Sequence, residues 1–289
     1  MRRIGQSGEA IEGAHRGDAM ASVPTASRSL RERINRPWRV FATGLSFAVF
    51  GIGAMVLALT LYPLGRLLPG DTLARDLRVQ RMVHWSYRFF VGLMVFLGLN
   101  RFRFEGFERL TTPGPHLIVA NHPSLLDTMT LLTKLPQADC VVGESWARKP
   151  FIGRAARLAG YVMNSSGAAA VDECVARLRE GRTLVLFPEG TRSPGGGLHP
   201  FQRGAAHIAL RSGCDLELVT LHVDPPTLKK GQPWWDIAER QVAYLARVEE
   251  PVRVGDHVRE GVADALAARR LTADLRARVI EGLNRGSSC

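Results

Sequence analysis

The sequence predicts an α/β fold, in which a mostly parallel sheet is flanked by helices and preceded by an N-terminal membrane-embedded helical pair. Three observations lead to this prediction. From Arg101 onward, short apolar runs alternate with amphipathic stretches, a pattern typical of parallel sheets. The segment between Arg39 and Arg66 contains no charged residue. A second apolar stretch, Phe89–Leu99, follows it.

The chain divides into three predicted parts. Residues 1–36 are rich in Gly, Ser, Ala and Arg and have no apolar periodicity, so we expect a disordered basic N-terminus. Residues 37–100 contain both apolar stretches and are expected to form a membrane-embedded helical hairpin. Residues 101–289 are expected to form the α/β domain.

The charge-free segment would make a helix roughly 35 Å long, enough to cross a bilayer core. It starts too late and is too long for an ordinary signal peptide. The competing interpretation is a buried core helix. Phe89–Leu99 is short for a span, and arginines flank the first segment on both sides, so charge alone does not set the orientation. A pair that enters one leaflet and returns would put the α/β domain on the cytoplasmic side of the inner (cytoplasmic) membrane.

The remaining elements follow from periodicity and turn residues. The predicted strands are Phe102–Glu105, Leu117–Ala120, Cys140–Val142, Tyr161–Met163, Thr183–Phe187, Leu216–Val223 and Val242–Val248. The predicted helices are Leu125–Lys134, Ile152–Ala159, Val171–Glu180, Gly204–Arg211 and two near the C-terminus, the last of them N-capped by Thr272.

The charge and cysteine content of the chain indicate which kinds of binding partner to expect. The net charge is +11, carried by 34 Arg and only 4 Lys, which suits an anionic membrane surface or a phosphorylated substrate. Genome composition would produce the same bias. The basic residues are dispersed and not interleaved with aromatics, so no nucleic-acid partner is expected. The four cysteines show neither CxxC nor zinc-ligand spacing, so no metal site is expected.

Two stretches carry candidate chemistry. In "LIVANHPSLLD" a predicted buried strand is followed directly by a predicted helix, and Pro123 can occupy the first turn of that helix. Asp127 can then approach His122 across the strand-to-helix connection. An Asp that fixes the imidazole tautomer leaves the other nitrogen free to take a proton. The competing interpretation is a structural His–Asp cap.

The second stretch, "FPEGTRS", ends a strand in a tight polar turn. Gly190 allows close backbone approach, Thr191 offers a hydroxyl and Arg192 offers a fork for phosphate. The turn lacks Walker-loop spacing. An ordinary turn with a surface Arg is the alternative.

Together, N-H-x-x-x-x-D and the later F-P-E-G-T-R-S resemble the glycerolipid acyltransferases of the lysophosphatidate acyltransferase (PlsC-type) family. The segments Lys149–Met163 and Phe201–Leu210 are also similar to the family, and the resemblance covers roughly residues 101–285. It implies acyl transfer from acyl-CoA or acyl-carrier protein, as co-substrate and without a cofactor, to a lysophospholipid, most directly 1-acylglycerol-3-phosphate. Carried over by position, His122 is the general base, Asp127 orients it, and Glu189, Gly190, Thr191 and Arg192 hold the acceptor, with Arg192 on its phosphate.

The sequence departs from the family where Asn164, Ser165 and Ser166 stand in place of an expected Arg. A different acceptor, of the lyso-ornithine lipid type, is therefore an alternative, and Arg154, Arg157 or Arg203 are candidates for the missing charge. Two further alternatives are a serine hydrolase that uses Ser145 of "GESWA" as nucleophile, with His207 or His222 as its base, and a membrane-tethered binding protein without catalysis.

Overall fold

The computed structural model describes residues 30–164, 167–194, 197–258 and 264–286. Most of the segment predicted to be disordered, residues 1–29, lies outside these ranges. The helices are α1 (Leu30–Leu59), α2 (Leu61–Leu67), α3 (Thr72–Phe96), α4 (Asp127–Leu132), α5 (Glu144–Ala147), α6 (Pro150–Leu158), α7 (Gly167–Arg179), α8 (Gly204–Ser212) and α9 (Asp264–Gly286), with 3₁₀ turns at Phe107–Thr111 and Val254–His257. The strands are β1 (Asn100–Glu105), β2 (His116–Ala120), β3 (Asp139–Gly143), β4 (Val162–Asn164), β5 (Thr183–Leu186), β6 (Leu216–Asp224) and β7 (Val242–Val248).

The strands form one seven-stranded sheet in the order β1-β7-β6-β2-β5-β3-β4. Neighbours pair in parallel except at β6–β7, so β1 and β7 run opposite to the other five strands. The predicted mostly parallel sheet is confirmed, and β2 lies near its centre between β5 and β6. The carboxyl ends of these parallel strands meet at one edge, where α/β sheets bind ligands.

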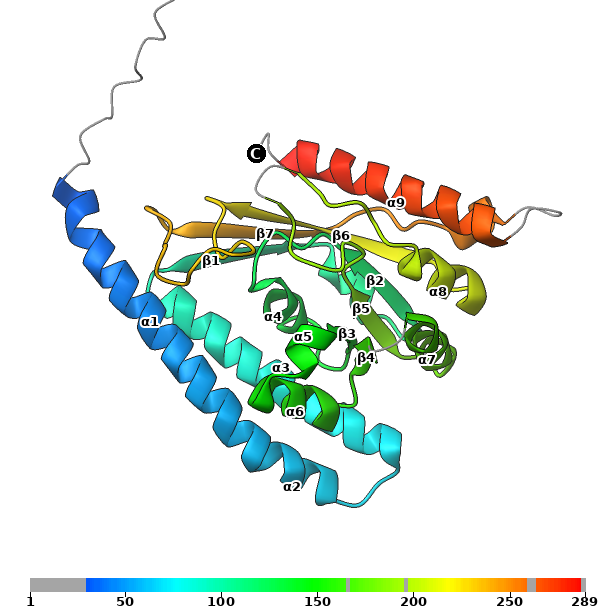
Figure 1. The fold of residues 1–289 in the computed structure, drawn as a ribbon, viewed down its shortest axis with the longest axis horizontal. Helices are drawn as coiled ribbons and strands as arrows, with labels where there is room; N and C mark the ends of the chain where they lie inside the picture. Colours follow the sequence, from blue (N-terminus) through cyan, green and yellow to red (C-terminus); the bar gives the residue numbers. More distant parts are fainter. Residues whose placement is uncertain (1–29, 165–166, 195–196, 259–263, 287–289) are drawn as a thin grey trace, which may run out of the picture.

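Alternate side chains of β2 point to opposite faces of the sheet, as the period of a strand requires. Leu117 and Val119 join one hydrophobic cluster with residues of α7, α8 and α9. Ile118 and Ala120 join a second cluster with residues of α4. Figure 1 shows α8 and α9 above the sheet and α3, α4 and α6 below it, so helices cover both faces.

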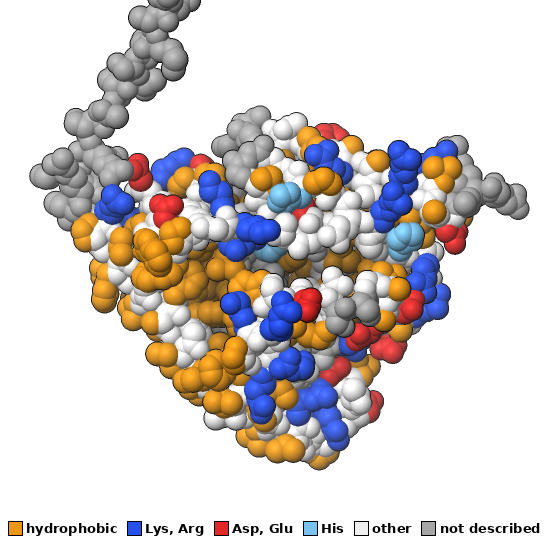
Figure 2. All heavy atoms as spheres, viewed as in Figure 1, with side chains coloured by type: hydrophobic (Ala, Val, Ile, Leu, Met, Phe, Trp, Pro, Cys, Tyr) orange, Lys and Arg blue, Asp and Glu red, His pale blue; other side chains and the backbone are white. Residues whose placement is uncertain are grey.

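Within the described residues, one helical stretch, Arg36–Leu67, is long and apolar enough to cross a membrane by length and composition. Its most apolar window of 18 residues has a mean hydropathy of 2.1, and 11% of that window is buried. Trp38 and Phe41 are among its exposed side chains. Figure 2 shows hydrophobic side chains gathered over this flank and along a hollow in the same face, with basic side chains bordering the hollow. This is a possible membrane segment, and the predicted entry into one leaflet stays a prediction.

Helix α3, which holds most of the second apolar stretch, packs on the α/β domain. Phe90 and Met94 are buried with Leu126 and Tyr244. Polar residues of α3 are buried as well: Nε2 of Gln80 donates to Oδ1 of Asp139 at 2.9 Å and to the carbonyl of Ala159 at 3.1 Å. Nδ1 of His84 lies 2.7 Å from the carbonyl of Leu132. Helix α3 therefore shares a core and a polar network with the α/β domain.

The C-terminal prediction was wrong in one respect. A single helix, α9, runs through the region where two helices were expected, and Thr272 lies inside it. The Thr272 hydroxyl donates to the carbonyl of Ala268 at 2.7 Å, one turn back. Threonine can satisfy its hydroxyl this way within a helix, so a capping residue in the sequence does not by itself mark a helix start.

Candidate active site

The first candidate stretch begins where β2 ends, and Asn121 fixes the position of that end. Its Nδ2 donates to the carbonyl of Leu221 at 2.9 Å, and its Oδ1 accepts from the Leu221 N–H at 2.7 Å. The side-chain amide thus replaces one peptide unit in the pairing of β2 with β6. Because this pairing is buried, it fixes where the chain leaves the sheet and where His122 begins.

His122 and Asp127 are in direct contact: Nδ1 of His122 lies 2.8 Å from Oδ2 of Asp127. The same Oδ2 accepts from the Ser124 N–H at 2.7 Å. The path between them differs from the prediction, because α4 begins at Asp127 and Pro123 lies in the turn before it. A non-helical turn of four residues, and not a helical first turn, therefore brings the carboxylate back to the imidazole.

The electrostatics of this pair follow from burial. Asp127 is 1% exposed, and its desolvation raises the pKa of the carboxyl, although the hydrogen bonds from His122 and Ser124 oppose the shift. The imidazole is partly exposed and stacks on the Phe187 ring, with ring centroids 4.2 Å apart. An ionised Asp127 only accepts, which assigns the Nδ1–H tautomer and leaves the Nε2 lone pair free.

The second stretch follows β5, and its Glu189 is buried and faces the protein. Oε1 accepts from the His122 N–H at 3.0 Å and from the Ser193 hydroxyl at 2.6 Å. Oε2 accepts from the His199 N–H at 2.8 Å. The resemblance implied that Glu189 holds the acceptor directly. Since both oxygens already serve protein donors, the geometry favours a positioning role for Glu189.

The turn after β5 binds both main-chain groups of His122. Glu189 accepts from the His122 N–H, and the Ser193 N–H donates to the His122 carbonyl at 2.6 Å. Gly190 makes this turn with φ of +67°, in the left-handed region. A Cβ on Gly190 would lie 2.3 Å from Nε2 of Gln202, so both the conformation and the space require glycine.

Arg192 extends from the turn toward the loop between β6 and β7. Its Nη1 donates to the carbonyls of Leu228 at 2.7 Å and Lys229 at 3.1 Å. Partial burial lowers the pKa of Arg192, and the negative charge of Asp127 opposes that shift. Thr191 is half-buried beside it, and no hydrogen bond joins its hydroxyl to a described residue. The structure therefore brings all six candidate residues to one end of the sheet.

The sequence did not identify the β6–β7 loop as part of this region. It carries Lys229 and Lys230, which line a cavity of about 610 Å³ beside Arg192 and Ser193. The loop also contacts α1: the Arg39 side chain donates to the carbonyls of Ala238 at 3.1 Å and Arg240 at 2.6 Å. The only signal in the sequence was that two of its four lysines are adjacent, in "LKKGQPWW".

The alternative candidates lie elsewhere. Ser145 is exposed in the short helix α5, and none of the described histidines hydrogen-bonds to it. On α6, Arg154 donates to the Ala58 carbonyl at 3.0 Å and Arg157 to the Ala147 carbonyl at 3.1 Å. Arg203 is exposed at the start of α8. Within the described residues, no group of three or more His, Cys, Asp or Glu side chains could hold a metal ion.

Comparison with known proteins gives a consistent result. The family model described as "Acyltransferase" matches residues 101–224. The chain is 37% identical over 103 residues to a 1-acyl-sn-glycerol-3-phosphate acyltransferase of Helicobacter pylori, covering 33% of this chain and 44% of that protein. It is 32% identical over 123 residues to a chloroplastic 1-acyl-sn-glycerol-3-phosphate acyltransferase of Brassica napus, covering 40% and 36%. The chain thus spans less than half the length of these curated relatives.

The fold is similar to that of a solved structure, the 1-acyl-sn-glycerophosphate (LPA) acyltransferase PlsC from Thermotoga maritima. The TM-score is 0.63, and the match covers 88% of this chain and 98% of that chain. The sequence identity is 20%, so this comparison establishes the fold alone.

Proposed function

The chain carries an acyltransferase domain of the PlsC-type family, and on that premise we propose that it transfers a fatty acyl group from a thioester to the free hydroxyl of a lysophospholipid. The proposed acceptor is 1-acylglycerol-3-phosphate and the product is phosphatidic acid. The single observation that carries the proposal is the contact at 2.8 Å between His122 Nδ1 and Asp127 Oδ2, which leaves Nε2 free to take a proton.

In the proposed reaction, His122 Nε2 accepts the proton of the acceptor hydroxyl as its oxygen attacks the thioester carbonyl. A C–O bond forms, the C–S bond breaks and the departing thiolate takes the proton back from the imidazolium. The electron pairs and the proton balance without an acyl-enzyme intermediate. Asp127 stabilises the imidazolium and fixes its orientation, which is the role of the carboxylate in related triads.

The second stretch supplies positioning and binding in this scheme. Glu189 holds the His122 main chain, Gly190 permits the tight turn, and Thr191 and Arg192 face the acceptor. A guanidinium matches phosphate geometry with paired donors, which supports Arg192 as a ligand of the acceptor phosphate. No metal or organic cofactor is needed, because the thioester donor, acyl-CoA or acyl-carrier protein, supplies the activated acyl group.

The N-terminal helices support a membrane location, which we place at the cytoplasmic membrane with the catalytic domain on the cytoplasmic side. The apolar flank formed by α1 would hold the site at the leaflet surface. The acyl chain of the lysolipid could then stay among other lipids, and its transfer into water, costing about 0.8 kcal/mol for each CH₂ group, would be avoided.

The test compares lipid extracts from cells that express the wild-type chain, His122→Ala or Ser145→Ala, followed by assays of the purified proteins in detergent. We expect wild type and Ser145→Ala to convert 1-acylglycerol-3-phosphate to phosphatidic acid with an acyl thioester. His122→Ala should lose roughly 10²- to 10⁴-fold of the rate.

Other outcomes select the alternatives. Consumption of a lyso-ornithine lipid in place of 1-acylglycerol-3-phosphate would keep the acyltransferase but replace the proposed acceptor. Loss of activity in Ser145→Ala, with His122→Ala still active, would indicate the serine hydrolase. If wild type and His122→Ala give matching extracts for all lysolipids, the proposed function is wrong.

A further inference from the structure

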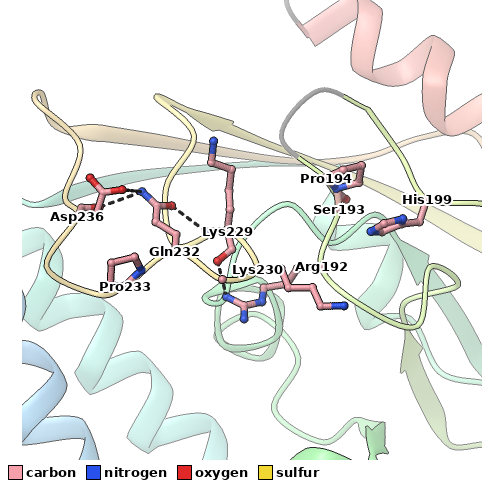
Figure 3. A pocket seen from close by; sticks show the side chains of 10 residues that line it. Arg192, Ser193, Pro194, His199, Lys229, Lys230, Gln232, Pro233 and Asp236 are labelled. Atoms are coloured by element: carbon pink, nitrogen blue, oxygen red, sulfur yellow. Dashed lines mark hydrogen bonds between the residues drawn. The ribbon is translucent and has the colours of Figure 1, made fainter.

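The cavity beside Arg192 is lined mainly by cationic and neutral side chains. Three cations, Arg192, Lys229 and Lys230, and one carboxylate, Asp236, line it, together with His199 and Gln232. Asp236 accepts from Nε2 of Gln232 at 3.1 Å. Figure 3 shows Ser193 and His199 on one side, Gln232 and Asp236 on the other, and Arg192 with the two lysines between them. Such a lining favours an anion.

The two lysines are held by a turn of defined geometry. The Lys229 N–H donates to Oε1 of Gln232 at 3.0 Å, and the Gln232 N–H donates to the Lys229 carbonyl at 3.1 Å. Leu228, just before them, has φ of +53°, which is uncommon for a residue other than glycine. Its side chain is buried with Leu126 and Tyr244, and this packing holds the backbone in that conformation.

The same turn positions Arg192. One of its terminal nitrogens, Nη1, is anchored by the carbonyls of Leu228 and Lys229, while Nε and Nη2 have no acceptor among the described residues. A guanidinium carries five N–H donors, so several are free for a ligand. Arg192 and the lysines thus belong to one preorganised group of donors.

This group lies next to the proposed base. The residue after Arg192, Ser193, donates its N–H to the His122 carbonyl at 2.6 Å. On the other side, the Leu125 N–H donates to the Leu228 carbonyl at 3.2 Å. The β6–β7 loop therefore packs directly on the corner that holds His122 and Asp127.

We propose that Lys229 and Lys230, together with Arg192, bind the phosphate group of the acceptor lysophospholipid. The inference rests on the proposed function. In 1-acylglycerol-3-phosphate the reacting hydroxyl and the phosphate ester stand on adjacent carbons, so base and phosphate site must be neighbours. The lysines would supply the positive charge that the sequence lacks at positions 164–166. Arg154 and Arg157, by contrast, donate to the carbonyls of Ala58 and Ala147.

Phosphate also occurs in the donor, since coenzyme A carries several phosphate groups. The loop's contact with the His122 corner favours the acceptor, because its phosphate must stay close to the reacting oxygen whereas the phosphates of coenzyme A are separated from the thioester by the pantetheine arm. Kinetics in which acceptor and donor are varied separately distinguish the two sources.

The experiment uses the full chain in detergent micelles and measures KM for 1-acylglycerol-3-phosphate and for acyl-CoA. The variants are the double substitution Lys229→Gln with Lys230→Gln, the same pair changed to Arg, and Lys149→Gln. Lys149 is the matched control: it is exposed on another element, with its ammonium 5.2 Å from the centre of the Trp146 ring. We expect the Gln pair to raise KM for the acceptor about 10- to 100-fold, with kcat and KM for acyl-CoA little changed. The Arg pair keeps both charges and should have a lower acceptor KM than the Gln pair, whereas Lys149→Gln should match wild type.

An unchanged acceptor KM in the Gln pair would overturn the inference, and so would a rise confined to acyl-CoA. In both cases wild-type activity with 1-acylglycerol-3-phosphate would leave the proposed function standing. If wild type acylates no lysolipid, or only one without a phosphate, the proposed function and this inference fail together.

Discussion

The Glu189 side chain holds the His122 main chain: the His122 N–H donates to Oε1 of Glu189 at 3.0 Å, although the two residues are 67 positions apart. His122 follows the end of β2 and Glu189 follows the end of β5, and these two strands are neighbours in the sheet. The contact makes the proposed base depend on the second stretch for its position.

Glu189→Gln should disturb this arrangement more than its small change in shape suggests. Two donors point at Oε1 and one at Oε2, so at least one of the three would face an NH₂ group in either orientation of the amide. We expect a loss of about 1–3 kcal/mol in unfolding free energy and a lower kcat, measured by thermal denaturation and steady-state assays. Glu281→Gln, at an exposed ion pair, is the control and should be nearly neutral. Wild-type stability and rate in Glu189→Gln would refute the positioning role.

Asp127→Asn should change how stability depends on pH. Burial raises the pKa of Asp127 above its unfolded value of about 3.9, so the folded chain binds more protons than the unfolded chain between those two pKa values. Wild-type stability should therefore fall, through this group, as pH rises across that window. The variant lacks the group, so the difference in unfolding free energy should shift in its favour as pH rises above about 4.

Denaturation of both proteins across that pH range checks this prediction, and a pH-independent difference would contradict it. Activity should move the other way. An amide does not stabilise an imidazolium as a carboxylate does, so Asp127→Asn should lose at least about 100-fold in kcat at every pH while remaining folded.

Gly190→Ala should distort the turn that carries Thr191 and Arg192. The left-handed conformation costs a residue with a Cβ roughly 1–2 kcal/mol, and here the Cβ also meets the Gln202 amide. We expect a lower melting temperature and a higher acceptor KM. Gly204→Ala is the matched control, since no atom lies within 4 Å of its added Cβ. Equal behaviour of the two variants would show that the turn tolerates the change.

Asn121→Asp tests the amide that joins β2 to β6. The carboxylate could still accept from the Leu221 N–H, but it would face the Leu221 carbonyl without a donor in a buried site. The cost should be at least about 1–3 kcal/mol, read from chemical denaturation. Asn164→Asp, at the exposed end of β4, should cost little. A stable Asn121→Asp chain would mean that the backbone ladder alone fixes the end of β2.

Much of the sheet could be predicted because each strand is a short apolar run bounded by turn residues. Val242–Val248 was predicted to the residue, and β2 and β5 differ from prediction by one residue. The approach of His122 to Asp127 was also accessible, since it depends on a local turn. The non-helical shape of that turn could not be predicted, because Pro123 fits both a helical first turn and a turn that precedes the helix.

The inward orientation of Glu189 and the placement of Lys229 beside Arg192 were not predictable. Both depend on contacts between segments far apart in the chain, and the loop that carries Lys229 has no periodicity to reveal where it folds back. At Thr272 the local sequence was misleading, because threonine is a common N-cap residue. The structure shows that its hydroxyl instead donates to a carbonyl one turn earlier in the same helix.

The buried polar face of α3 sets where a shortened chain can begin. A chain cut at Arg101 would remove Gln80 from Asp139 and His84 from the Leu132 carbonyl, and would uncover the apolar core around Phe90. A chain that starts at Asp71 keeps the hydrogen bonds of Gln80 and His84. It loses α1 and α2, and with α1 the side chains of Phe47 and Phe50 that pack against Phe90. The boundary between the apolar helices and the helix that shares the polar network of the α/β domain therefore falls at Gly70, between α2 and α3, about thirty residues before the first strand.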